Sequence, residues 1–113
     1  MAAPKLRGPH KLMSGVIDIF VPAGVAGVYA LGPIVPGGLQ EVDAVGRAER
    51  DLAEALKGLV GVSSGFMFAT VSSAAEAFLQ ECELHHAHGL AGRRAHPVAP
   101  ERSGLECPIC GRG

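Results

Sequence analysis

The residues best suited to chemistry lie near the C-terminus, where two residues separate Cys107 from Cys110 and Gly111 follows. Two thiolates at this spacing can bind one metal ion, and the glycine lets the backbone turn around it. Structural zinc takes four ligands in a tetrahedral arrangement, and this pair supplies two of them. The spacing therefore predicts one half of a zinc site.

Candidates for the other half form a short cluster upstream. Cys82, His85 and His86 stand at positions i, i+3 and i+4, so a helix would place them on one face. The connection to the terminal cysteine pair, about twenty residues, is long enough to fold back at little extra entropic cost. We expect zinc to be held by Cys82, by His85 or His86, and by the terminal pair, with His96 not required.

Two other interpretations of the same residues stay open. In one, Cys82 is a small core residue, the histidines form a solvated helix end, and the terminal cysteines bind nothing. In the other, the terminal pair is a redox dithiol, although no helix follows it to lower the pKa of a thiol.

Three segments also resemble the zinc finger of the DksA/TraR-type transcription regulators. They are residues 82–85 (CELH), 92–99 (GRRAHPVA) and 107–110 (CPIC), which cover less than a third of the chain. The resemblance implies a zinc-binding role and, as one alternative function, a regulator that contacts nucleic acid or the transcription machinery. The expected turn at 61–65 lacks the acidic tip of those regulators, so their activity is not carried over.

Composition limits the class of protein. The chain has 113 residues, enough for one small domain, with 48% hydrophobic residues, no Trp and one Tyr. Ten basic residues balance eleven acidic ones, and this near-zero net charge argues against sequence-independent binding to nucleic acid. An odd count of three cysteines favours a metal site or free thiols in a reducing compartment, so we expect a cytoplasmic protein.

The periodicity predicts a mainly α fold built on an antiparallel helical hairpin. Apolar residues recur at helical spacing over 39–60, where Arg47 and Asp51 would form an ion pair on the water-facing side. A second apolar stripe predicts a helix over 64–88. Short β-type runs at 16–21 and 25–31 are expected to cover the hairpin as a β-hairpin or extended segment. The resulting organisation is a tail (1–13), one domain (14–88) and an irregular C-terminal arm (89–113).

A small α+β fold of order ββαβα is the alternative. It places a strand at 66–71 and starts the last helix at Ser73, because Ser73 and Glu76 match a capping box.

No coherent catalytic set is present, so we do not expect an enzyme. The apolar, aromatic-poor body favours a non-catalytic interaction or assembly subunit that self-associates or binds a protein partner, with a zinc-stapled arm. Residues 19–40 and 58–75 carry no charged side chain, which makes a membrane-associated subunit a further alternative. Prolines in the first stretch and serines in the second favour a soluble core instead.

Overall fold

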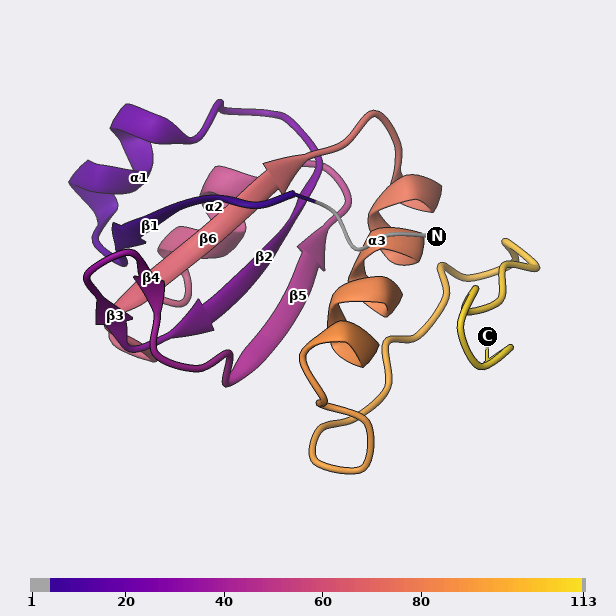
Figure 1. Cartoon of the computed structure of the whole chain (residues 1–113). Coiled ribbons are helices and arrows are strands. Elements are labelled where there is room, and N and C mark those ends of the chain that lie inside the picture. Colours follow the sequence, from indigo (N-terminus) through magenta and orange to yellow (C-terminus); the bar gives the residue numbers. More distant parts are fainter. Residues whose placement is uncertain (1–4, 113) are drawn as a thin grey trace.

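The computed structural model describes residues 5–112 and is centred on a four-stranded antiparallel sheet (Figure 1). In spatial order its strands are β1 (Arg7–Lys11), β6 (Gly65–Thr70), β2 (Gly27–Gly32) and β5 (Ala44–Ala48). A two-stranded hairpin of β3 (Ile34–Val35) and β4 (Gly38–Leu39) lies between β2 and β5 in the chain. The helices are α1 (Ser14–Phe20), α2 (Leu52–Lys57) and α3 (Ala74–Ala87).

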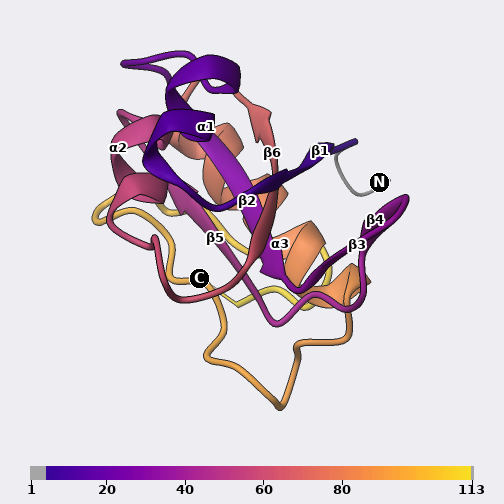
Figure 2. The ribbon, with the colours of Figure 1, turned by 90° about the vertical axis from the view of Figure 1, so that its left-hand side faces the viewer.

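The two faces of the sheet are covered by different helices. Tyr29 and Leu31 of β2 stand opposite Phe68 and Phe66 of β6, and this face packs against α1 and α2. The main core lies there, and its buried members are Leu12, Ile17, Val21, Leu31, Ala48, Leu52, Ala53, Leu56, Phe66 and Phe68. Since side chains alternate along a strand, Val28 points to the opposite face, which α3 covers. In Figure 2, α1 lies in front of the sheet and α3 lies behind it.

Two of the helices, α2 and α3, begin with a side-chain cap. The hydroxyl of Ser73 accepts a hydrogen bond from the amide of Glu76 (3.1 Å), which satisfies a free N–H at the start of α3. The carboxylate of Asp51 does the same for the amide of Glu54 (3.2 Å) at the start of α2. These caps fix where the two helices begin and therefore where the preceding strands must end.

The prediction of a mainly α helical hairpin is wrong, and the fold is a small α+β domain. The segment 39–60 contains β5 and the short helix α2, and the segment 64–88 contains β6 followed by α3. The apolar run at 16–21 falls mostly in α1, whereas the run at 25–31 overlaps β2. The alternative of a strand near 66–71 and a helix starting after Ser73 describes this part of the chain correctly. Its order ββαβα nevertheless omits β1, β3, β4 and β5 and places a strand where α1 forms.

Tertiary pairing explains why the segment 39–60 does not form one helix. Strand β5 pairs with β2 over five residues, which satisfies its backbone groups in a ladder. Opposite Tyr29 stands Gly46, where an added Cβ would lie 2.2 Å from the Tyr29 hydroxyl oxygen. The missing side chain therefore lets the tyrosine lie flat across the strand. This arrangement outweighs the local helical preference of the flanking residues.

The structure also bears on the tail and on the uncharged stretches. Residues 7–11, within the expected tail, form β1 and pair with β6, while residues 1–4 lie outside the described part of the chain. Across residues 5–112, no helix has both the length and the apolar character needed to cross a membrane.

Candidate metal centre

Four potential metal ligands converge where the C-terminal arm passes α3. They are His86 near the end of α3, His96 in the arm, and Cys107 and Cys110 in the turn formed by residues 107–111, here called the terminal knuckle. Their ligand atoms all lie within 4.8 Å of one another. Figure 1 shows the arm turning back after α3, so that its last residues run beside the helix.

The orientation of His96 suits a metal ligand. Its Nδ1 lies 2.7 Å from the carbonyl oxygen of Pro97, a geometry in which Nδ1–H donates and Nε2 keeps a free lone pair. That Nε2 lies 3.3 Å from the Sγ of Cys110. A hydrogen bond from the second ring nitrogen to a backbone carbonyl is the usual way in which proteins fix a metal-binding tautomer.

The side chain of His86 supplies the clearest sign of an absent partner. Its Nε2 is buried and has no hydrogen-bond partner among the described residues. A buried polar atom without a partner costs about 1–3 kcal/mol, so proteins rarely leave one in place without a ligand, ion or water. Here the residue with the unsatisfied nitrogen belongs to the same group as two cysteines and a second histidine.

The terminal knuckle favours the thiolate form of Cys107. The amide of Gly111 donates to the carbonyl of Cys107 (2.9 Å), and Gly111 has the positive φ of +80° that closes such a turn. Burial by itself would raise the pKa of the Cys107 thiol. Hydrogen bonds from the amides of Cys110 and Ile109, together with the adjacent His96 and Cys110 side chains, outweigh burial and lower the pKa to about 6. Cys107 is therefore ready to bind a cation at neutral pH.

The donor set and its spacing fit zinc. Two nitrogen and two sulfur ligands are a common structural zinc set, and bond lengths near 2.0–2.3 Å place neighbouring ligand atoms about 3.4–3.8 Å apart in a tetrahedron. The His96–Cys110 pair, at 3.3 Å, is already close to that separation. The limit of 4.8 Å over all four atoms leaves only small side-chain movements to close the set.

Of the five residues predicted from the sequence, His86, Cys107 and Cys110 belong to this group, and Cys82 and His85 do not. Cys82 is fully buried in a small apolar cluster with Phe78 and Cys107. Burial, and then its hydrogen bond to Cys107, raise the pKa of the Cys82 thiol to about 12. At neutral pH Cys82 is thus a neutral thiol that packs beside Cys107.

His85 lies next to the group without joining it. It is almost fully buried, and its ring centroid is 5.3 Å from those of His86 and His96. Burial, followed by the charges of the neighbouring histidines, lowers the pKa of His85 and keeps its ring neutral. The complete ligand assignment made from the sequence stays a prediction, and variants of Cys82 and His96 separate the two sets.

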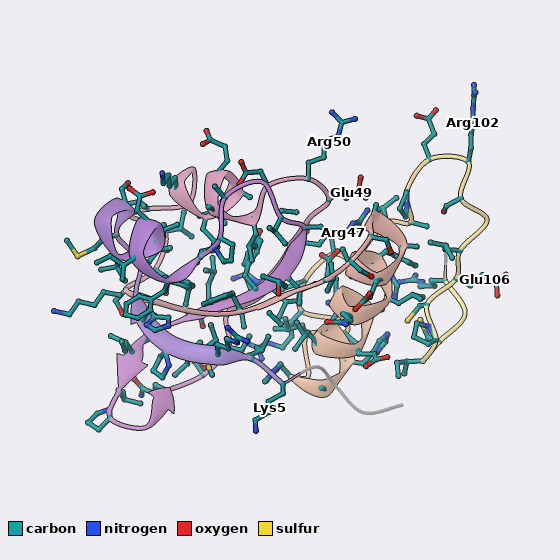
Figure 3. All side chains as sticks on the ribbon, turned by 90° about the horizontal axis from the view of Figure 1, so that it is seen from above. Lys5, Arg47, Glu49, Arg50, Arg102 and Glu106 are labelled. Carbon is teal, nitrogen blue, oxygen red and sulfur yellow. The ribbon has the colours of Figure 1, made fainter. Side chains whose placement is uncertain are left out.

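Sequence reasoning also missed a polar contact beside the metal centre. The guanidinium of Arg47 on β5 donates to the Glu81 carboxylate on α3 (2.7 Å) and to the carbonyl of Val98 in the arm (2.6 Å). It also lies 5.3 Å from the centre of the Phe78 ring and bonds Glu49 at 3.1 Å. Figure 3 shows Arg47 beside α3. The expected pairing of Arg47 with Asp51 would have required a helix where the chain forms β5.

Burial and the opposite charge act on the pKa values of Glu81 and Arg47 with different net results. Burial raises the pKa of Glu81, and the adjacent Arg47 offsets part of that effect. For Arg47, burial would lower the pKa, but the hydrogen bond and charge of Glu81 outweigh it and raise the pKa instead. The short contact between the two groups, 2.7 Å, is a charge-assisted hydrogen bond in a partly buried site.

Comparison with known proteins gives no external guide to this site. No family model matches the sequence, no curated protein matches it, and no solved structure matches the fold. The similarity to the DksA/TraR-type finger thus stays a local one, and the chemistry rests on the geometry described above.

Proposed function

We propose that the protein is a non-catalytic interaction subunit whose C-terminal arm is stapled to α3 by one zinc ion. His86, His96, Cys107 and Cys110 would hold the metal. The observation that carries this proposal is the buried, unpartnered Nε2 of His86 within a group of two cysteines and a second histidine.

The number of ligands supports a structural role for the metal. Four protein ligands complete a tetrahedral zinc site, whereas catalytic zinc keeps one position open for water or substrate. The arm also needs such a staple, because its apolar contacts are few. Its buried cluster consists of Phe78, Cys82 and Cys107, with Leu79, Ala99 and Leu105 packed at the edge.

Exposed apolar side chains support the proposed interaction role. Ile19 at the end of α1 is 75% exposed, and Phe20, which follows it, is 48% exposed. Val60 and Val62, in the loop between α2 and β6, are exposed as well. Exposed large apolar side chains are typical of surfaces that meet another protein when they form a patch. We propose self-association or a protein partner in the cytoplasm, where three free cysteines are stable.

Metal analysis of protein purified without added zinc tests the proposal. The wild-type protein should carry one equivalent of zinc, and His86→Ala, His96→Ala and Cys107→Ser should each lose most of it. His88→Ala is the matched control, because His88 lies exposed at the C-terminal end of α3 and outside the ligand group. Less than about a tenth of an equivalent in the wild-type protein would refute the zinc site, since structural sites bind zinc too tightly to lose it on purification.

The interaction role is tested separately by sedimentation velocity on zinc-loaded protein. Self-association predicts a sedimentation coefficient that rises with concentration, and Ile19→Ser should reduce that rise. A stable monomer that captures no partner would contradict the interaction role and leave the zinc site untouched.

A further inference from the structure

Arg47 is the one described side chain that joins the sheet, α3 and the arm at a single point. Its two terminal nitrogens bond Glu81 of α3 and the backbone carbonyl of Val98 of the arm, at 2.7 and 2.6 Å. The side chains of Arg47 and Glu81 are only 17% and 12% exposed. The contact between Arg47 and Glu81 is therefore poorly screened by water, whereas the bond to Val98 lies at the surface.

Both partners of Arg47 lie close in the chain to metal ligands. Val98 follows His96 by two residues, and Glu81 precedes His86 by five residues on the same helix. The guanidinium thus sets the separation between the segment that supplies one histidine and the helix that supplies the other.

We propose that Arg47 is a positioning residue for the metal centre, which raises zinc affinity by holding the arm against α3 without touching the ion. This inference rests on the proposed zinc site. An arm that is already placed loses less conformational freedom when the metal binds, so less of the binding free energy is spent on ordering it. Outer-shell groups of this kind typically change metal affinity by about 10- to 100-fold.

The shape of the guanidinium is part of the argument. Three of its nitrogens serve three acceptors at once, namely Glu49, Glu81 and Val98. A lysine ammonium carries the same charge but cannot present a planar fork to separated acceptors. Lysine at this position should therefore fail to restore most of the zinc affinity, which separates positioning from a simple effect of positive charge.

The experiment is a zinc titration of the full chain against a chromophoric chelator of known affinity. Arg47→Met is expected to weaken zinc binding about 10- to 100-fold, and Arg47→Lys nearly as much. Arg50→Met is the matched control, because Arg50 is exposed and extends away from α3 in Figure 3. Its zinc affinity should stay within about twofold of the wild-type value, since exposed arginines contribute little.

A second measurement separates positioning from general stabilisation. The free energy of unfolding is measured in urea with zinc and with EDTA, for the wild-type protein and for Arg47→Met. Positioning predicts that the substitution costs more stability with zinc than without it, because binding and arm placement are coupled. Equal costs in the two conditions, or wild-type zinc affinity in Arg47→Met, would overturn the inference.

Two further outcomes are distinguishable. Should Arg47→Met fail to fold, Glu81→Gln removes the charge of the partner while keeping an acceptor, and an unchanged zinc affinity in that variant would also overturn the inference. A wild-type protein that binds no zinc in the same titration would instead refute the proposed function itself.

Discussion

Replacing Cys82 distinguishes a core thiol from a metal ligand. The Cys82 side chain is fully buried beside Phe78 and Cys107, and its raised pKa, about 12, keeps it protonated. Cys82→Ala removes one sulfur from this cluster, which should cost about 1–2 kcal/mol in the free energy of unfolding from lost burial and a small cavity. Cys82→Ser places a hydroxyl in the same apolar site, and its desolvation should bring the cost to about 1–3 kcal/mol.

Two measurements on each variant check this reasoning. Urea unfolding in EDTA gives the metal-free stability, and elemental analysis of the purified protein gives the zinc content. We expect both Cys82 variants to lose stability and to keep about one equivalent of zinc, since a neutral thiol outside the four-ligand group is not needed for a closed site. His96→Ala should show the opposite behaviour, losing zinc while its metal-free stability changes little. A Cys82→Ser protein without zinc but with wild-type stability in EDTA would refute the reasoning and make Cys82 a ligand.

Three other predictions concern the fold and the pH dependence. A methyl group at Gly27 would meet a leucine of α2 at 2.5 Å and a carbonyl oxygen of β6 at 2.6 Å, so Gly27→Ala should destabilise the protein by about 1–3 kcal/mol in urea. Gly15→Ala, where nothing lies within 4 Å, should be neutral or stabilising, and equal effects at the two sites would contradict the packing argument. Ser73→Ala removes the cap of α3 and should cost about 1 kcal/mol, measured by thermal unfolding against the wild-type protein. Because the pKa of Cys107 is lowered from 9.0 to about 6, its contribution to stability in EDTA should be complete above pH 9 and lost as the pH falls through 6. Zinc binding should weaken in the same direction, which a chelator titration at pH 5.5 and 7.5 would show.

Local signals in the sequence indicated the last strand and helix, but only as the alternative to a single helix over 64–88. The capping box at Ser73 and Glu76 marks the start of α3 because a cap is a local interaction, fixed by residues three apart. The start of α2 carries a similar local signal, since Asp51 caps the amide of Glu54, but the apolar pattern runs through it without a break. Its residues repeat at helical spacing, and only the ladder with β2 and the contact of Gly46 with Tyr29 decide that the first part is a strand. Such contacts join segments far apart in the chain, which a periodic pattern does not report.

The candidate site shows the same division. The cysteine pair could be predicted from its spacing, because both ligands must reach one ion from a single tight turn. The position of His96 beside the cysteines depends on how the arm folds back along α3. Spacing along one helix face therefore gives no indication that His96 joins the group. Arg47 was missed for a related reason, since a helix over 39–60 would have placed its side chain in water.

The small cluster between α3 and the arm is separate from the main core between the sheet and the other two helices. Because the two clusters share no buried residue, we expect the arm to open without unfolding of the sheet. Hydrogen exchange would report this as two populations of amides, with those of the arm exchanging through local opening and those of β2 and β6 only through global unfolding. A higher concentration of free zinc would then slow the exchange of the arm amides alone. This effect would stop growing once opening of the arm is as rare as global unfolding. In such a protein the metal sets how often the outer face of α3 becomes accessible, while the fold beneath it stays intact.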